Sequence, residues 1–219
     1  MKCVLVLAGL DPSGGAGLLA DAEAIRAAGA RPLCVATALT VQSTLKARRF
    51  ETVAVRLVKD SIEALLEEEN VGAIKIGMIG SEELGDALDA LLPRDLPRVV
   101  DPVLRASSGA SLLHGSPAVY LRLAKHGLLT PNLPEAKALG ELGPAVLLKG
   151  GHRDGETVYD TLITPQGRED FTGARIAARK RGTGCRLASF IAAKLAAGSD
   201  LRAAVLDARS FVRTYLEAP

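Results

Sequence analysis

Arg181-Gly182-Thr183-Gly184-Cys185 leads directly into a segment with helical periodicity, residues 186–197, and the rest of the chain is organised around this junction. The two glycines permit a tight turn whose N–H groups point one way, and the helix adds unpaired N–H groups and the positive end of its dipole. This combination predicts an anion site, usually for a phosphate. The thiol of Cys185 lies at the mouth of that site, where a thiolate forms more easily than in bulk water. The alternative is a plain turn in which the glycines serve geometry alone.

The composition indicates a globular protein and argues against several classes of partner. The 219 residues are 48% hydrophobic and 24% charged, with a formal net charge of +2 and no Trp. This balance gives no reason to expect nucleic acid or an acidic membrane surface, and scarce aromatic residues disfavour base stacking. The apolar run at residues 3–8 is too short for a signal peptide or a membrane span. We expect a cytoplasmic homodimer or other homo-oligomer with neither nucleic acid nor membrane as a partner.

The three cysteines are spaced for neither a zinc site nor a disulfide framework. Cys3 and Cys34 fall in apolar, strand-like runs, where a cysteine is usually a small buried hydrophobe. Cys185 is therefore the cysteine that we expect to carry chemistry.

Apolar runs alternate with segments of helical periodicity along the chain. Strands are expected at 2–8, 33–40, 73–77, 98–103, 128–130 and 145–148, and an antiparallel hairpin at 158–164 and 169–171. Among the intervening helices, one is expected to begin at Asp60 or Ser61 and to run to about Glu69. The alternation predicts one α/β domain over residues 1–219, with a mostly parallel central sheet covered by helices on both faces.

Two stretches in the first quarter of the chain leave alternatives. Gly15 to Ala20 matches the dinucleotide-binding pattern G-x-G-x-x-A, but no acidic residue ends the next strand, and no Walker A lysine follows the glycines. We therefore do not favour a dinucleotide site. The basic segment from Thr44 to Phe50 is either a solvated loop or a mobile flap over a phosphorylated substrate.

Several polar residues follow the predicted strands, where open parallel sheets bind their ligands. They include Asp11, Gln42, Asp101, Asn132, Glu135 and Lys149. Lys149 offers a cation for phosphates, while Asp101 and Glu135 offer oxygen ligands for Mg²⁺. Together with the turn at Cys185, these groups predict phosphoryl transfer. Taken singly, Asp101 could instead cap a loop and Glu135 could start a helix.

The same residues occur within motifs that resemble a known family, the hydroxymethylpyrimidine and phosphomethylpyrimidine kinases of thiamine biosynthesis, which are ribokinase-like vitamin kinases. The resemblance covers nearly the whole chain, in order. Its motifs are Ala8-Gly9-Leu10-Asp11-Pro12-Ser13-Gly14-Gly15-Ala16-Gly17, Ala20-Asp21, Thr37-Ala38-Leu39-Thr40-Val41-Gln42, Ile74-Lys75-Ile76-Gly77-Met78, Val100-Asp101-Pro102-Val103, Thr130-Pro131-Asn132-Leu133-Pro134-Glu135-Ala136, Leu148-Lys149-Gly150-Gly151-His152 and Gly182-Thr183-Gly184-Cys185.

The resemblance implies a three-layer ribokinase-like fold and ATP-dependent phosphorylation of 4-amino-5-hydroxymethyl-2-methylpyrimidine or its monophosphate. The residues that it assigns to the pyrimidine pocket are Gly9, Asp21, Gln42, Met78 and Val103. It assigns Asn132, Glu135 and Lys149 to ATP and Mg²⁺, with Asp101 beside the metal. Gly182, Thr183 and Gly184 would form the anion hole, and Cys185 occupies the position of the base in sugar-kinase relatives.

The chain departs from the family pattern at several positions. Relatives usually have His at the position of Arg181, a small hydroxyl residue at that of Arg186, and often a basic residue at that of Ser107. The helical insertion between Glu135 and Ala145 is nearly absent, as is the Gly/His-rich tail. We expect the first departures to bear on the substrate and the shortening to bear on nucleotide affinity.

Two further functions fit the same residues. One is a pyridoxine or pyridoxal kinase of the same fold, and the other is a pyrimidine- or nucleotide-binding relative without catalysis. Because binding alone does not require Asp101, Glu135, Lys149 and Cys185 together, we favour a kinase. We further expect Cys185 to be partly thiolate at neutral pH, helped by Arg181 and Arg186.

Overall fold

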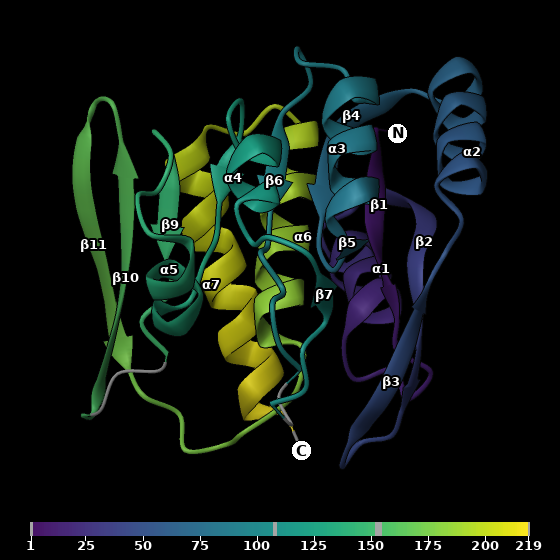
Figure 1. The fold of residues 1–219 in the computed structure, drawn as a ribbon. Helices are drawn as coiled ribbons and strands as arrows, with labels where there is room; N and C mark the ends of the chain where they lie inside the picture. The colour runs from purple at the N-terminus through teal and green to yellow at the C-terminus, as the bar shows by residue number, and fades with distance from the viewer. Residues whose placement is uncertain (1, 107–108, 152–154, 219) are drawn as a thin grey trace.

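The computed structural model describes residues 2–106, 109–151 and 155–218, and its central feature is a nine-stranded sheet (Figure 1). The strand order across this sheet is β11-β10-β9-β8-β6-β4-β1-β2-β3. Its strands are β1 (Cys3–Leu10), β2 (Arg31–Gln42), β3 (Ala47–Thr52), β4 (Val71–Ile76), β6 (Arg98–Val100), β8 (Leu128–Leu129), β9 (Val146–Leu148), β10 (Thr157–Thr164) and β11 (Gly167–Ala174). Two short strands, β5 (Gly80–Ser81) and β7 (Leu113–His114), pair separately.

Neighbouring strands are parallel from β2 across to β9, and antiparallel pairs close both edges of the sheet. The predicted mostly parallel α/β sheet is thus confirmed, as is the hairpin of β10 and β11. Because the inner strands are parallel, their carboxyl ends meet at one edge of the sheet, where the motifs of the chain are also concentrated.

Helices cover both faces of the sheet (Figure 1). The helices α2 (Val55–Glu68), α3 (Glu82–Leu91), α4 (Val119–Leu123) and α5 (Leu133–Leu139) contribute to one apolar cluster, and α1 (Gly17–Ala27), α6 (Thr183–Ala196) and α7 (Leu201–Glu217) to another. Along β1, Leu5 and Leu7 belong to the first cluster, whereas Val4 and Val6 belong to the second. This alternation is that of a strand buried on both faces.

The start of α2 corrects the sequence-based expectation. The helix begins at Val55 instead of Asp60 or Ser61, and Ala54 at its N-cap makes no side-chain capping bond. Ser61 lies inside the helix, where its hydroxyl donates to the carbonyl of Leu57 at 2.7 Å. A serine whose hydroxyl bonds to a carbonyl of the preceding turn is accommodated inside a helix, so it need not mark the helix start. The apolar positions of this helix, which include Val58 and Ile62, decided its extent.

The basic segment between Thr44 and Phe50 is not a loop throughout, because Ala47 onward forms β3. This strand pairs antiparallel with the end of β2, with Val41 opposite Arg49. The turn closes through the N–H of Ser43, which donates to the carbonyl of Lys46 at 3.0 Å. The charges lie on an edge strand, where charged side chains protect the unpaired backbone from other strands.

Two further features bear on the expectations from composition. Cys3 is buried as expected, but Cys34 is exposed, because β2 lies near the edge of the sheet and one of its faces is partly uncovered. Among the helices in residues 2–106, 109–151 and 155–218, none is long and apolar enough to cross a membrane.

Candidate active site

The residues predicted for the site gather at the carboxyl edge of the parallel strands and at the start of α6. Gly9 and Gln42 lie at the ends of β1 and β2, Met78 follows β4, and Asp101 follows β6. Asn132 and Glu135 begin α5 after β8, Lys149 follows β9, and Cys185 lies in the first turn of α6. Ser107, where the chain departs from the family pattern, and His152, the last residue of one motif, fall outside the described residues.

The glycine turn before α6 has the geometry that its sequence predicts. Gly182 is the N-cap of α6 in the left-handed conformation, with φ of 71°, which a residue with a side chain rarely adopts. A Cβ on Gly184 would stand 3.1 Å from Nζ of Lys149 and 3.7 Å from Oδ2 of Asp101. The absence of that side chain leaves the turn open toward Lys149 and Asp101. An anion at the turn would therefore also meet the amine of Lys149.

Asp101 and Lys149 form a nearly buried ion pair beside this turn. Nζ of Lys149 lies 2.6 Å from Oδ1 of Asp101, which also accepts from the hydroxyl of Thr130 at 3.4 Å. Burial favours the neutral acid, but Lys149 and the more distant Lys75 outweigh it and lower the pKa of Asp101. Burial likewise opposes the charge of Lys149, yet Asp101 and Glu135 raise its pKa. Both groups are thus charged at neutral pH.

Asn132 and Glu135 cap α5 reciprocally. Oδ1 of Asn132 accepts from the N–H of Glu135 at 2.9 Å, and Oε2 of Glu135 accepts from the N–H of Asn132 at 2.8 Å. The alternative that Glu135 starts a helix is therefore confirmed, with Asn132 as the N-cap residue. Burial raises the pKa of Glu135 to about 7, with the neighbouring Asp101 adding to the shift and Lys149 opposing it. A cation beside Glu135 and Asp101 would favour their ionised forms.

These oxygens suit Mg²⁺ only together with other ligands. No group of three or more His, Cys, Asp or Glu side chains that could hold a metal occurs among the described residues. Both side-chain hydrogen bonds described for Asp101 go to Oδ1, and the one for Glu135 goes to Oε2. One oxygen of each carboxylate is thus available for a hard cation, which typically completes its shell with water and substrate phosphates. The donor set fits Mg²⁺ delivered with a nucleotide.

Cys185 is held as a thiol in this structure, contrary to the expectation that it is partly thiolate at neutral pH. Burial raises its pKa to about 12; the charge of Lys75 and an N–H from Gly17 oppose the rise, while the carboxylates of Asp21 and Asp101 add to it. The helix N-terminus does not overcome desolvation here. Nor do the two arginines that flank the turn, because both have other partners.

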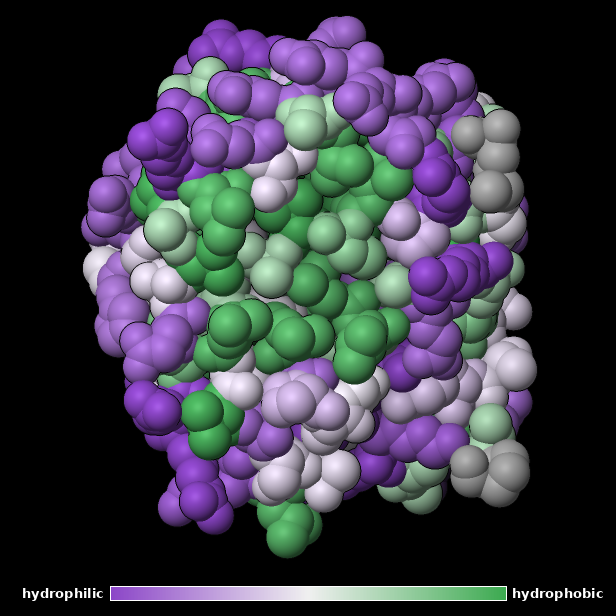
Figure 2. All heavy atoms as spheres, turned by 90° about the vertical axis from the view of Figure 1, so that its right-hand side faces the viewer, coloured by the Kyte–Doolittle hydropathy of each residue, from purple (hydrophilic) through white to green (hydrophobic). Residues whose placement is uncertain are grey.

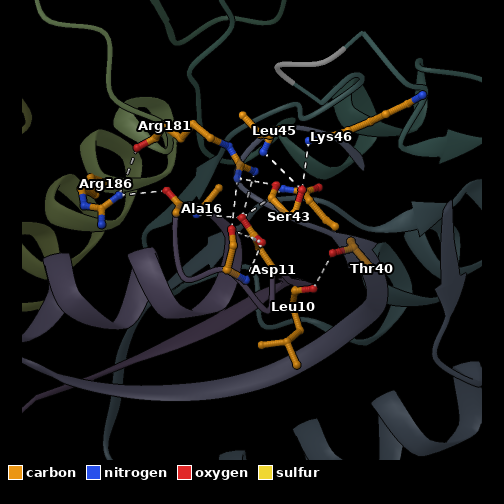
Figure 3. A network of polar contacts seen from close by, with 12 residues as sticks. Leu10, Asp11, Ala16, Thr40, Ser43, Leu45, Lys46, Arg181 and Arg186 are labelled. Atoms are coloured by element: carbon orange, nitrogen blue, oxygen red, sulfur yellow. Dashed lines mark hydrogen bonds and ion pairs between the residues drawn. The ribbon is translucent and has the colours of Figure 1, made fainter. Parts of the chain in front are cut away.

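Asp11 is the centre of a polar network in which Arg181 takes part (Figure 3). Its Oδ2 accepts from Nη2 of Arg181 at 2.9 Å and from Nε2 of Gln42 at 3.0 Å. The guanidinium continues to the hydroxyl of Ser13 and the carbonyl of Ser43, each at 3.1 Å from Nη1. Arg181 thereby joins the α6 turn, the glycine loop and the β2–β3 turn. This link could not be read from the sequence, since its ends are 170 residues apart.

Arg186 is also engaged in structure. Its guanidinium donates to Glu23 at 2.5 Å and to the carbonyl of Gly15 at 3.2 Å, and lies 4.1 Å from the ring centre of Tyr215. The hydroxyl of Tyr215 donates to the carbonyl of Arg181 at 3.1 Å. Arg186 therefore fastens the glycine loop and α7 to the start of α6.

A fully buried ion pair lies under the site. Nζ of Lys75 contacts Oδ1 of Asp21 at 2.7 Å, and the same oxygen accepts from the hydroxyl of Ser189 at 2.7 Å. Oδ2 of Asp21 is buried without a hydrogen-bond partner. Asp21 is thus enclosed, and its predicted place in the pyrimidine pocket stays a prediction. Lys75 was missed as a site residue, although a lysine between two isoleucines of a buried strand was a signal.

The residues predicted for the pyrimidine divide between an apolar and a polar side. Met78 belongs to a small cluster with Ala38 and Leu112, against which Val103 packs. A Cβ on Gly9 would stand 2.7 Å from Sδ of Met78, so only glycine permits this approach. Gln42 belongs to the polar network of Asp11, to which its Nε2 donates at 3.0 Å. The roles of these residues toward a ligand stay predictions.

The chain is similar to a family of known proteins over nearly its whole length. The family model described as phosphomethylpyrimidine kinase matches residues 11–144 and 137–219. The hydroxymethylpyrimidine/phosphomethylpyrimidine kinase of Escherichia coli is 34% identical, over 97% of this chain and 90% of that protein. The chain is also 34% identical to a thiamine biosynthesis multifunctional protein of Corynebacterium glutamicum, but spans only 30% of its length.

Solved structures of kinases share the fold. The phosphomethylpyrimidine kinase of Clostridium difficile superposes with a TM-score of 0.78 at 30% identity, covering 98% of this chain and 99% of that one. The pyridoxal kinase of Staphylococcus aureus in complex with AMP-PCP and pyridoxal superposes with a TM-score of 0.83 at 26% identity, covering 99% and 88%.

Proposed function

The chain belongs to the phosphomethylpyrimidine kinase family, and on that premise we propose that it phosphorylates 4-amino-5-hydroxymethyl-2-methylpyrimidine, its monophosphate or both, in thiamine biosynthesis. It is an ATP-dependent kinase with a three-layer, ribokinase-like fold. The observation that carries the proposal is the glycine turn of α6 opening onto Lys149, 3.1 Å from the position of a Cβ on Gly184. Backbone donors, a helix terminus and a cation then converge where a transferred phosphoryl group must be stabilised.

The proposed reaction joins the hydroxymethyl oxygen of the substrate to the γ-phosphorus of ATP. As this O–P bond forms, the bond from the γ-phosphorus to the bridging oxygen breaks and ADP leaves with the electron pair. Gly182, Thr183 and Gly184 would hold the oxygens of the moving phosphoryl group, and Lys149 would neutralise their charge. In the second phosphorylation, an oxygen of the substrate's phosphate takes the place of the hydroxyl.

Cys185 is the proposed acceptor of the hydroxyl proton. It can accept that proton only as a thiolate, a form that burial opposes and the charge of Lys75 favours. The loose transition state usual for phosphoryl transfer places most of the demand on positioning and electrostatics. The turn and Lys149 are therefore assigned a catalytic contribution of their own, beside the proton transfer to Cys185.

Mg²⁺ and ATP complete the proposed site. When bound, Mg²⁺ neutralises phosphate charge. Asp101 and Glu135 would hold it through the carboxylate oxygens that carry no described hydrogen bond. Asn132 would line the nucleotide side beside Glu135. Lys149, which pairs with Asp101 at 2.6 Å, would also contact a phosphate oxygen of the bound nucleotide.

A coupled ATP-consumption assay across substrates tests this function. We expect turnover of the hydroxymethylpyrimidine or its phosphate, with the phosphorylated product identified by mass. The competing candidate is pyridoxal kinase activity, favoured by the TM-score of 0.83 to the Staphylococcus aureus enzyme. Turnover of pyridoxal or pyridoxine alone would establish that alternative. If none of these substrates supported ATP consumption, both functions would be contradicted.

A second copy of the chain is the proposed partner at the β3 edge of the sheet. Figure 2 shows an apolar area in the middle of this face. Exposed side chains at this edge include Leu39 and Val41 of β2, at 50% and 43%, and Leu45 of the following turn at 90%. Patches of this kind mark association surfaces in globular proteins.

We retain the expectations of one kinase domain over residues 1–219 and of a cytoplasmic location.

Sedimentation equilibrium tests the association. Leu39→Lys combined with Val41→Lys is expected to convert the oligomer to monomer, because two charges would be buried at the contact. Ile163→Lys, at an exposed apolar residue of β10 on the opposite edge, is the matched control and should leave the mass unchanged. A monomeric parent protein would contradict the proposal.

A further inference from the structure

The backbone carbonyl of Arg181 accepts hydrogen bonds from side chains of two helices, α6 and α7. The hydroxyl of Tyr215, near the end of α7, donates to it at 3.1 Å. Nη1 of Arg186 in α6 donates to it at 3.3 Å (Figure 3), but the same Nη1 is shared with the carbonyl of Gly15 at 3.2 Å. Tyr215, by contrast, has this carbonyl as the single acceptor of its hydroxyl proton among the described residues.

This carbonyl shares its peptide bond with the N–H of Gly182, the first residue of the glycine turn. The bond is trans, and a trans peptide is planar with its C=O and N–H pointing in opposite directions. Because Tyr215 holds the carbonyl from the side of α7, the N–H of Gly182 is directed away from α7. Within the part of the chain that the structure describes, that N–H makes no hydrogen bond. It is therefore available to an anion at the turn.

The orientation of this peptide is not secured by the glycine itself. Gly182 has φ of 71°, but glycine adopts positive and negative φ about equally well. A peptide that precedes a glycine can consequently flip, as in the exchange between type I and type II turns. A flip here would turn the N–H of Gly182 toward α7 and the carbonyl of Arg181 in the opposite direction. The turn would then lose one donor, and a carbonyl dipole would oppose the anion.

We propose that Tyr215 is a positioning residue for phosphoryl transfer, because its hydroxyl fixes the peptide between Arg181 and Gly182 with the N–H of Gly182 toward the transferred phosphoryl group. The inference rests on the proposed function, which places the anion hole at residues 182–184. Tyr215 acts through the backbone and touches no ligand in this arrangement. Donors that are oriented before the reaction stabilise the charge of the transition state without reorganisation, so the contribution of Tyr215 is expected in kcat.

The ring of Tyr215 has a separate, structural role. The guanidinium of Arg186 lies 4.1 Å from the ring centre, and Nζ of Lys180 lies 5.2 Å from it. These cation–π contacts involve the ring and not the hydroxyl, so they remain when the hydroxyl is removed. Tyr215→Phe therefore removes the donor to the Arg181 carbonyl and keeps the packing, whereas Tyr215→Leu removes both.

The test measures kcat and KM with ATP and whichever pyrimidine or pyridoxal substrate the parent protein phosphorylates. Removing one oxyanion-hole donor typically lowers kcat by about 10²- to 10³-fold. Tyr215→Phe leaves the donor present but unfixed, so we expect kcat to fall by about 10-fold with KM and the unfolding midpoint close to the parental values. Tyr215→Leu should lower kcat by a similar factor and the midpoint as well. The matched control, Tyr159→Phe at an exposed tyrosine of β10, should change neither.

Binding of ADP with aluminium fluoride, a mimic of the phosphoryl group in transfer, distinguishes positioning from a purely structural role. Tyr215→Phe should weaken this complex by about the factor lost in kcat, while the affinity for ATP is unchanged. Parental kcat, or parental affinity for the mimic, in Tyr215→Phe would overturn the inference. Turnover of pyridoxal alone would refute the proposed substrate, and the same comparison of Tyr215→Phe with the parent would then decide the inference on pyridoxal.

Discussion

The two sides of the site differ in how their carboxylates are satisfied. On the side of the glycine loop, Asp11 accepts five hydrogen bonds, so donors of the protein itself compensate its charge. On the side of α5, Asp101 and Glu135 crowd around the single amine of Lys149, and burial raises the pKa of Glu135 to about 7. A carboxylate whose oxygens all accept hydrogen bonds from the protein fixes local geometry. Two carboxylates that share one lysine keep negative charge that a cation bound with its nucleotide can neutralise. The contrast therefore separates a side that holds its own geometry from a side whose carboxylates leave room for a cation.

The largest expected effect is at Cys185, between the two sides. If its sulfur accepts the substrate proton, Cys185→Ala should lower kcat by about 10²- to 10⁴-fold while ATP binding persists. Cys185→Ser is the matched variant and should lose most of kcat as well. Steady-state kinetics at saturating substrates measures both.

Near-parental kcat in Cys185→Ala would assign catalysis to the turn and Lys149 alone. Because burial holds Cys185 as a thiol, iodoacetamide should label the exposed Cys34 before Cys185 in the free protein. Faster labelling of Cys185 would show that the pocket opens to a thiolate.

Lys149→Met tests whether the charge of Lys149 is needed to stabilise the buried carboxylate of Asp101. Removing the amine leaves Asp101 as an unpaired buried charge, which typically costs about 3–5 kcal/mol of unfolding free energy. Denaturant titration at pH 7 measures this loss. Adding Asp101→Asn to Lys149→Met should restore part of it, and no recovery in the double variant would contradict the charge argument.

Glu135→Gln sharpens the comparison through pH. Glu135 has a folded-state pKa of about 7, above its ordinary value of 4.5, so the folded protein holds a proton that the unfolded chain releases. The resulting stability is present below about pH 4.5 and is lost as pH rises toward 7. Glu135→Gln should remove this decline, as measured by unfolding between pH 4.5 and 8.

The same variant reports on the metal. Glu135→Gln keeps the shape of the side chain without its charge, so we expect lower activity and a several-fold higher Mg²⁺ requirement. Parental Mg²⁺ dependence would confine Glu135 to its capping role with Asn132.

Arg186→Lys should have the smallest effect on kcat, and it tests the glycine-loop side of the comparison. The lysine loses the bonds to Glu23 and Gly15 and the stacking on Tyr215, at a cost of about 1–2 kcal/mol in unfolding free energy. Because Arg186 holds the loop and not a ligand, kcat should stay within about 2-fold. A large fall in kcat with unchanged stability would place Arg186 in the chemistry.

Much of the architecture could be predicted from the sequence because its signals are local. Strand β1 reads as an unbroken apolar run, Gly182 stands where α6 needs a left-handed N-cap, and the hairpin of β10 and β11 is set by its turn at Gly167. The predicted helix start at Asp60 or Ser61 was wrong because it relied on a local signal alone. A local capping signal cannot reveal that Val58 and Ile62 are needed to cover the sheet.

The sequence by itself determined which chemical groups stand at the strand ends: the glycine turn with Cys185, the cation of Lys149 and the carboxylates of Asp101 and Glu135. Spacing and residue type suffice for that, since parallel strands end at a common edge. Only the tertiary structure decided the state of those groups. Arg181 was expected to activate Cys185 but pairs with Asp11, and Cys185 remains a thiol because burial outweighs the neighbouring charge of Lys75. Protonation and partner choice depend on distances and on the exclusion of solvent. Contacts between residues up to 170 positions apart in the chain set both.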